Sequence, residues 1–304
     1  GAMVRPEEMP QPGEVGPIRD MPTEQVVKAA SMIKQGKMIS LAASRFTGMP
    51  LFPGHPPFQV INAVSPRGIV ADGRQPWGPI NDANLGYMAE YLMCTSHSGA
   101  HIDGLAHMTI GEDMHWYGGG QADKHLGDHG PIFGDAAKMP PFFTRGVFLD
   151  VPAYRGVPHL QTGEPVDAAE LEDIAKAQGV EVRQWDVVVI RTGYMSLWPD
   201  YDAMMANKTA GPDISAADWL LRKGVVATGT DTETYEVQPA PDPGPEGNPQ
   251  PVHKHLLIDN GIYLMESLDL EELSKEKLYE FAFIALPLKI RGATASMVDP
   301  VAAI

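Results

Sequence analysis

Residues 96–108 of this 304-residue chain read SHSGAHIDGLAHM and concentrate its potential metal ligands. Three histidines and one aspartate fall within eleven positions of this stretch: His97, His101, Asp103 and His107. Neutral imidazole nitrogens and carboxylate oxygens bind divalent cations such as zinc and manganese, with ligand bonds of about 2.0 to 2.2 Å. The stretch therefore predicts a divalent-metal site.

The spacing of these residues also indicates how the backbone must run. All four are odd-numbered positions, so a flat strand would place their side chains on one face. It would also separate His97 from Asp103 by about 20 Å, too far for one ion. A continuous helix would instead turn Asp103 away from the histidines. Gly99 and Gly104 favour a tight loop, because glycine adopts backbone angles that other residues avoid. We therefore expect a strand over residues 91–95 that runs into a metal-binding loop.

The rest of the chain predicts a single α/β domain with a mixed, sheet-rich core. Residues 1–37 form an N-terminal extension, loosely packed up to residue 22 and then helical, and residues 38–304 form the main domain. Runs of β-branched and apolar residues predict strands at 38–41, 60–70, 85–95, 146–151, 186–191, 224–230, 262–265 and 283–286. Caps and apolar spacing predict helices over 23–36, over 167–179, from Ser215 and over 271–281, with long loops at 108–142 and 239–251.

Composition limits the kinds of partner. A formal net charge of −16 argues against a nucleic-acid or anionic-membrane partner, so we expect a small-molecule substrate. We see no apolar run long enough to span a bilayer and no signal-peptide pattern. The single cysteine, Cys94, excludes an internal disulfide and suits a reducing compartment. These features favour a cytoplasmic protein.

Several segments together resemble one protein family. HSGAHIDGLAH (residues 97–107) resembles the H-x-G-T-H-x-D-x-P-x-H signature of the metal-dependent cyclase family, which includes bacterial kynurenine formamidase and isatin hydrolase. Further likenesses follow in the family's order in MISLAASRFTGMPLFPGHP (38–56), WDVVVIRTGYMSLW (185–198), GTDTETYE (229–236), HKHLLIDNGIYLMESLDLEEL (253–273) and PLKIRGATAS (287–296). An ordered set of motifs is more specific than any single one. The resemblance implies a swivelling β/β/α fold and a homo-oligomer, either a dimer or a tetramer.

The resemblance also implies a set of ligands. His97, His101 and Asp103 would bind a first metal ion, zinc or manganese. His107 would serve either as a ligand for a second metal ion, bridged by Asp103, or as a proton shuttle. His253 and Glu266 would complete that second position, so one or two ions are expected. His253 and His255 are both candidates for the downstream ligand, and the distance to Leu256 and Leu257 favours His253.

The chemistry implied by the resemblance is hydrolysis of an amide or cyclic amide bond, or of a related imide or lactone, by metal-bound hydroxide. The catalytic residues would be His107, His253 and Glu266. The candidate substrate-binding residues are four aromatic side chains and the threonine that replaces the serine of G-T-D-x-x-S: Phe52, Trp77, Trp116, Tyr117 and Thr234. Ala100 and Leu105 depart from the signature, which keeps open a catalytically silent protein that contains a metal and binds a small molecule.

Overall fold

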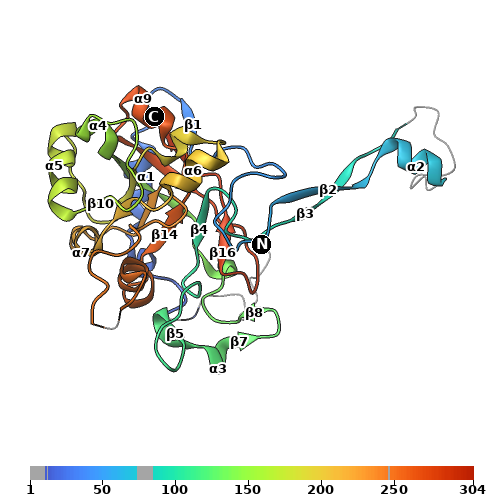
Figure 1. The fold of residues 1–304 in the computed structure, drawn as a ribbon, viewed down its shortest axis with the longest axis horizontal. Helices are drawn as coiled ribbons and strands as arrows, with labels where there is room; N and C mark the ends of the chain where they lie inside the picture. The colour runs from blue at the N-terminus through green and yellow to red at the C-terminus, as the bar shows by residue number, and fades with distance from the viewer. Residues whose placement is uncertain (1–10, 12, 74–84, 246) are drawn as a thin grey trace.

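The core of the protein is a nine-stranded mixed sheet (Figure 1), seen in a computed structural model that describes residues 11, 13–73, 85–245 and 247–304. In spatial order its strands are β1 (Met38–Ser40), β17 (Val301–Ala303), β15 (Glu280–Ala285), β9 (Phe142–Asp150), β11 (Val187–Arg191), β13 (Ala227–Thr230), β14 (Tyr263–Glu266), β4 (His101–Asp103) and β16 (Ala295–Met297). The predicted α/β fold with a mixed, sheet-rich core in one domain is confirmed.

The middle of the sheet is parallel and its two sides are antiparallel. Strands β9, β11, β13 and β14 run in parallel, with Val188 in register with Val147 on one side and Thr228 on the other. Every residue of β11 is buried, as expected for a parallel strand covered on both faces. Beyond β14 the chain direction reverses at β4, so the end of β14 lies beside β4. The strands predicted at 186–191, 224–230 and 262–265 are confirmed in β11, β13 and β14.

Helices cover both faces of the sheet. The alternation along β15 shows this, because Phe281 and Phe283 belong to the main core while Ala282 and Ile284 pack with Ala29 on the other side. The longer helices are α1 (Thr23–Ala30), α5 (Ala168–Gln178) and α7 (Ile214–Lys223), and the shorter ones are α2 (Pro66–Asp72), α3 (Ala122–His125), α4 (Val151–Arg155), α6 (Tyr201–Asn207), α8 (Pro251–His253) and α9 (Glu271–Glu276). A π-helical turn over Lys254–Asp259 follows α8. None of the helices in the described part of the chain is long and apolar enough to cross a membrane.

The predicted helix boundaries are confirmed at the start of α5 and are wrong at the start of α7 and the end of α1. Asp167 caps α5 by accepting a hydrogen bond from the Glu170 backbone N–H at 2.8 Å, as predicted. The predicted cap of α7 is wrong, because Asp213 rather than Ser215 accepts the first backbone N–H groups. Helix α1 follows Pro22 and ends at Ala30, so the predicted extent to residue 36 is wrong.

Two predicted segments change structure partway along. The extended segment predicted at 60–70 is wrong from Pro66 onward, because the Ser65 hydroxyl caps α2 by accepting from the Gly68 N–H at 3.1 Å. The helix predicted over 271–281 ends at Glu276, and Lys277 adopts a left-handed φ of 53°. Strand β15 then begins at Glu280, because pairing with β9 places Phe281 and Phe283 in the core.

The N-terminal segment before α1 packs against the body. Ile18 is part of the main core, and the buried Glu14 accepts a hydrogen bond from the Gly134 N–H at 3.2 Å. The expectation of loose packing is therefore wrong for residues 13–22. Residues 1–10 and 12, which the same expectation covered, lie outside the described residues.

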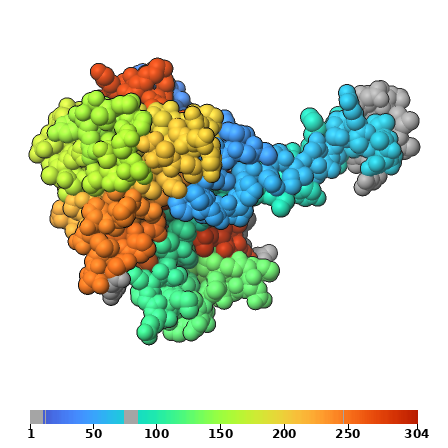
Figure 2. Space-filling model, viewed as in Figure 1, coloured from blue at the N-terminus to red at the C-terminus, as the bar shows by residue number. Residues whose placement is uncertain are grey.

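A two-stranded arm projects from the body (Figures 1 and 2). It consists of β2 (Gln59–Val64) and β3 (Ala89–Met93), which pair antiparallel, together with α2. Below it in the same view lies a lobe with four short strands, β5 (His115–Trp116), β6 (Gly120–Gln121), β7 (Leu126–Gly127) and β8 (Gly130–Pro131). The predicted loop at 108–142 is thus a lobe of short hairpins that runs into β9.

Candidate metal centre

The histidine-rich stretch combines a turn with a short strand. His101 and Asp103 lie two residues apart on β4, so both side chains point from the same face of the strand. The prediction of a loop throughout this stretch is therefore wrong for residues 101–103, which form β4. His97 lies in the preceding turn, where Gly99 has the left-handed φ of 61° that favours glycine. The turn brings His97 back toward Asp103, which a continuous strand could not do.

The ligand atoms gather in two groups that share Asp103. In the first group, atoms of His97, Asp103 and His107 lie within 4.8 Å of one another, with 3.0 Å between His97 Nδ1 and Asp103 Oδ1. In the second group, atoms of His101, Asp103 and Glu266 lie within 4.8 Å, with 3.3 Å between His101 Nε2 and Glu266 Oε2. This grouping differs from the one implied by the resemblance, in which His97 and His101 share an ion.

Glu266 and His253 reach the site from far along the chain. Glu266 is the last residue of β14 and pairs in register with His101 of β4. His253, on α8, places Nε2 at 3.4 Å from Glu266 Oε1 and 3.8 Å from Asp103 Oδ2. His255 instead forms an ion pair with Asp218, 2.8 Å between Nε2 and Oδ1. Of the two downstream histidines, His253 is the one that faces the cluster.

Glu236 is a buried carboxylate that the sequence prediction missed. It accepts hydrogen bonds from the backbone N–H groups of Val252 and His253, both at 2.9 Å, and contacts His253 Nδ1 at 2.6 Å. This contact fixes the His253 ring with Nε2 turned toward Glu266. The signal was its place at the end of GTDTETYE, a segment from which the prediction took only Thr234. A carboxylate that orients a metal-binding histidine is a common part of metal sites.

Thr294 and Glu233 are two more neighbours that the prediction missed. The Thr294 hydroxyl lies 3.2 Å from His97 Nε2, and this residue belongs to the PLKIRGATAS segment. Glu233 has a buried Oε2 with no hydrogen-bond partner among the described residues. Burial and the charge of Glu266 raise the pKa of Glu233 to about 7.

The buried polar atoms of the cluster fit a divalent cation. Asp103 is fully buried, yet neither of its carboxylate oxygens has a partner with hydrogen-bond geometry among the described residues, and His101 Nε2 has none either. Unpaired polar atoms of this kind are costly in a protein interior unless a ligand satisfies them. Imidazole and carboxylate donors together suit zinc or manganese, and a carboxylate shared by two groups can serve one ion or two.

The charges in the cluster reinforce this fit. Burial lowers the pKa of His101 and of His253, but the neighbouring carboxylates outweigh burial and raise these pKa values to about 9 and about 10. Burial tends to raise the pKa of Asp103, and the surrounding imidazoles lower it below its usual range. Burial lowers the pKa of His107 to about 4. The carboxylates that hold protons on these imidazoles would stabilise a divalent cation in the same place.

The expected substrate-binding residues lie in different places. Phe52 is on the side of the cluster, since its ring centre lies 5.8 Å from that of His55, which is 5.6 Å from that of His97. Thr234 is buried and donates to the Glu236 carbonyl at 3.1 Å.

Trp116 and Tyr117 contact other parts of the protein. Trp116 is buried and donates its indole N–H to the Phe133 carbonyl at 3.1 Å. The ring of Tyr117 packs against Gly261. Trp77 lies outside the described residues.

Fold and site together define an α/β protein with a candidate metal centre at the carboxyl end of a parallel strand. A family model described as "Putative cyclase" matches residues 39–237, and the chain belongs to this family. The predicted resemblance to the metal-dependent cyclase family is thereby confirmed. No curated protein matches the chain.

Solved structures show the same fold. A structure described as a novel cyclase is 27% identical, with a TM-score of 0.83 and coverage of 96% of each chain. An isatin hydrolase bound to the product analogue thioisatinate is 18% identical, with a TM-score of 0.64 over 93% of this chain and 99% of the other. A predicted metal-dependent hydrolase from Bacillus stearothermophilus is 16% identical, with a TM-score of 0.52 over 88% of this chain and 97% of the other.

Proposed function

We propose that this protein is a metal-dependent hydrolase that cleaves an amide or cyclic amide bond, or a related imide or lactone, in a small aromatic substrate. The observation that carries the proposal is Asp103, a fully buried carboxylate that is shared by two groups of potential ligands and surrounded by imidazoles. Neither of its oxygens has a partner with hydrogen-bond geometry among the described residues. Membership in the cyclase family and the isatin hydrolase and hydrolase titles of structural neighbours support it.

The metal would be held by residues of the cluster. His97, His107 and Asp103 offer one position, and His101, Asp103 and Glu266 offer another, with His253 beside Glu266. A bound divalent cation lowers the pKa of water from 15.7 toward about 7 and polarises a carbonyl oxygen. One or two ions of zinc or manganese would fit this donor set.

The chain's own residues would then orient water and move protons. His107 lies on the His97 side of Asp103, with 4.2 Å between the His97 and His107 ring centres. With an ion held by His101, Asp103 and Glu266, His107 is free to hold the attacking water and accept its proton. His253, oriented by Glu236, would donate a proton to the departing nitrogen. Glu266 would position His101 and His253, both of which it contacts.

The surroundings of the cluster suit an aromatic substrate. Phe52 and His55 provide ring faces next to His97 for a planar molecule. Lys208 Nζ lies 6.0 Å from the centre of the Phe52 ring, so a cation is available beside that ring for an anionic group of a substrate. We therefore favour substrates whose carbonyl is attached to, or fused with, an aromatic ring.

Metal content and turnover of variants test this function. We expect the purified protein to carry at least stoichiometric zinc or manganese, and expect His101→Ala and Asp103→Asn to lose most of it and all turnover. His115→Ala, which removes a histidine that pairs with Asp113 in the lobe, should keep both. Turnover would be measured on N-formylkynurenine, isatin and other cyclic amides, imides and lactones.

The outcomes separate hydrolysis from its alternatives. A protein that is active without metal would rule out the mechanism. A protein that carries metal and binds these compounds tightly, but turns none of them over, would instead be a metal-containing binding protein.

A further inference from the structure

Three adjacent parallel strands end beside the candidate metal centre. Strands β11, β13 and β14 are neighbours in that order, and Ile190 of β11 is in register with Thr230 of β13. Their carboxyl ends therefore meet at one edge of the sheet, about 4.8 Å apart from strand to strand. Ligands of α/β proteins commonly bind at such an edge. It carries Tyr194 after β11, Glu233 after β13 and Glu266 at the end of β14.

Hydrogen bonds hold the segments after β11 and β13 together. Asp231 Oδ1 accepts from the N–H and from the hydroxyl of Thr192, both at 2.7 Å. Tyr194 and Glu233 each lie two residues beyond this contact. Their side chains are therefore neighbours at the edge of the sheet.

The segment after β13 also contacts the end of β14. The Thr232 carbonyl accepts a hydrogen bond from the Ser267 N–H at 2.9 Å, so Glu233 lies beside the segment that carries Glu266. The charge of Glu266 acts on Glu233, whereas the carboxylates that act on Tyr194 are Glu233 and Asp231. The order along the edge is thus the metal centre, then Glu233, then Tyr194.

Glu233 and Tyr194 both end in a buried polar atom that lacks a hydrogen-bond partner among the described residues. These atoms are Glu233 Oε2 and the hydroxyl of Tyr194, a residue that is 2% exposed. Unpaired atoms of this kind are costly unless a ligand satisfies them. Burial and the charges of Glu233 and Asp231 raise the pKa of the Tyr194 phenol, so it keeps its proton and can donate. The carboxylate oxygen of Glu233 can accept.

We propose that Glu233 and Tyr194 are specificity-determining residues that select a cyclic imide, an inference that rests on the proposed function and narrows its substrate class. A cyclic imide presents a carbonyl, an N–H and a second carbonyl in a row along one edge of its ring. The first carbonyl would face the metal centre, the N–H would donate to Glu233 Oε2, and the second carbonyl would accept from the Tyr194 hydroxyl. A lactone lacks the N–H, and a lactam lacks the second carbonyl.

The reaction on such a substrate is the addition of water across one C–N bond. The hydroxyl joins the carbonyl carbon at the metal centre, and the nitrogen takes the proton and stays attached to the second carbonyl. Glu233 and Tyr194 would therefore contact the same amide group before and after the bond breaks. In the G-T-D-x-x-S segment Glu233 stands at a variable position, so the family resemblance assigns it no role.

An aromatic wall lies beside this row of polar groups. Thr234 Oγ1 donates to the Lys208 carbonyl at 3.4 Å, and Lys208 Nζ lies 6.0 Å from the centre of the Phe52 ring. Phe52 is thus on the side of the segment that carries Glu233. This placement favours an imide fused to an aromatic ring.

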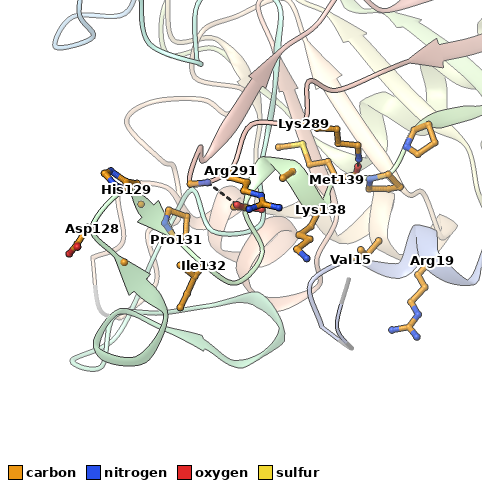
Figure 3. A pocket seen from close by; sticks show the side chains of 17 residues that line it. Val15, Arg19, Asp128, His129, Pro131, Ile132, Lys138, Met139, Lys289 and Arg291 are labelled. Atoms are coloured by element: carbon orange, nitrogen blue, oxygen red, sulfur yellow. Dashed lines mark hydrogen bonds between the residues drawn. The ribbon is translucent and has the colours of Figure 1, made fainter. Parts of the chain in front are cut away.

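A larger cavity, of about 1170 Å³, lies elsewhere and provides a control. It is lined by residues of the N-terminal segment, the lobe and the segment before β16, within 15–19, 127–141 and 289–292 (Figure 3). Asp128 is an exposed carboxylate in its wall. Asp128→Asn therefore removes a carboxylate charge at a hollow that the proposed recognition does not use.

Four compounds that share one bicyclic frame test the recognition. Phthalimide has all three groups, N-methylphthalimide lacks the N–H, isoindolinone lacks the second carbonyl, and phthalide is the lactone. Wild-type kcat/KM should be at least about 100-fold higher for phthalimide than for N-methylphthalimide, because a site built around an N–H rejects an analogue without it. Equal kcat/KM for these two compounds would overturn the inference and leave the proposed hydrolase in place.

Variants separate recognition from the differing reactivity of the four compounds. Glu233→Leu should lower the preference for phthalimide over N-methylphthalimide by about 30-fold or more, and Glu233→Gln, which keeps an acceptor oxygen, should retain most of it. Tyr194→Phe should lower the preference for phthalimide over isoindolinone by about 10-fold. Its melting temperature should not fall, because the hydroxyl has no partner to lose. Asp128→Asn should leave both preferences unchanged.

Binding distinguishes failure of this inference from failure of the proposed function. Calorimetric titration of the purified protein should show that phthalimide binds more tightly than N-methylphthalimide, and that Glu233→Leu abolishes the difference. That result without turnover would uphold the recognition and refute the hydrolase. Equal binding of the two compounds by wild type, or a lower melting temperature of Tyr194→Phe with both preferences unchanged, would overturn the inference.

Discussion

Asp103 is the residue at which the two halves of the candidate metal centre meet. The sequence identified it because carboxylate and imidazole donors are crowded into residues 97–107. The sequence could not show that the carboxylate faces His97 with Oδ1 and His253 with Oδ2. That arrangement depends on β14 and α8, which are distant in the chain. The sequence could therefore predict that Asp103 is a candidate metal ligand, but not which side chains face each of its oxygen atoms.

Glu236 should affect metal binding through His253. Glu236→Gln keeps the shape of the side chain but removes the charge that orients the imidazole. We expect metal affinity to fall by about 10- to 100-fold, as is typical when a carboxylate behind a ligating histidine is lost. Chelator competition would measure the affinity, with Glu164→Gln on the surface as the control. Equal affinities for Glu236→Gln and wild type would show that His253 needs no such support.

Asp231 should make the stability of the fold depend on pH. Burial raises its pKa to about 6, although it accepts hydrogen bonds from the N–H and hydroxyl of Thr192 at 2.7 Å. Arg191 lowers this pKa and Glu271 raises it, and burial remains the larger effect. Because the folded pKa lies above the unfolded value, the stabilisation is complete below pH 4 and is lost as pH rises through about 6.

Asp231→Asn removes this dependence while keeping an oxygen that accepts the same hydrogen bonds. Relative to wild type, its free energy of unfolding should rise between about pH 4 and 6 and then level off, by up to about 3 kcal/mol. Urea denaturation of both proteins from pH 4.5 to 8 would measure the difference. A difference that is the same at every pH would mean that Asp231 has an ordinary pKa.

Arg191 ties three elements of the fold together. From the end of β11 its guanidinium lies 3.0 Å from Asp150 at the end of β9, and makes two bonds of 2.7 and 2.9 Å to Glu271 at the start of α9. Arg191→Met leaves the buried Asp150 without its cation and should cost about 3 to 5 kcal/mol of unfolding free energy. Arg155→Met breaks a more exposed pair with Glu170 and should cost about 1 kcal/mol or less. Equal losses in thermal or urea unfolding would contradict this account.

For helices and strands, prediction from sequence succeeded where the residues of the element itself favour one structure. The β-branched run of β11 and the Asp167 cap of α5 specify structure without help from the rest of the chain. It failed at β4, where His101 and Asp103 are polar and the strand exists because β14 and β16 pair with it on both sides. It also failed at α9, because the core contacts of β15 end the helix early.

At the scale of the whole molecule, the sheet is what assembles the site. The chain order alone leaves Glu266 far from Asp103, and the order of strands in the sheet places β14 next to β4. The family resemblance predicted that His253 and Glu266 come to the cluster, although spacing and periodicity contain no such information. The arm formed by β2 and β3 was predicted only as extended segments. Nothing in a single sequence shows that such a hairpin extends away from the body.

The central claim, that hydrolysis by this protein depends on a divalent metal at Asp103, is tested most directly by chelation and metal replacement. Turnover of the best substrate would be followed while metal is removed and then restored. Activity should fall with metal content, return on addition of zinc or manganese, and fail to return in Asp103→Asn. Full turnover by metal-free wild-type protein would contradict the account.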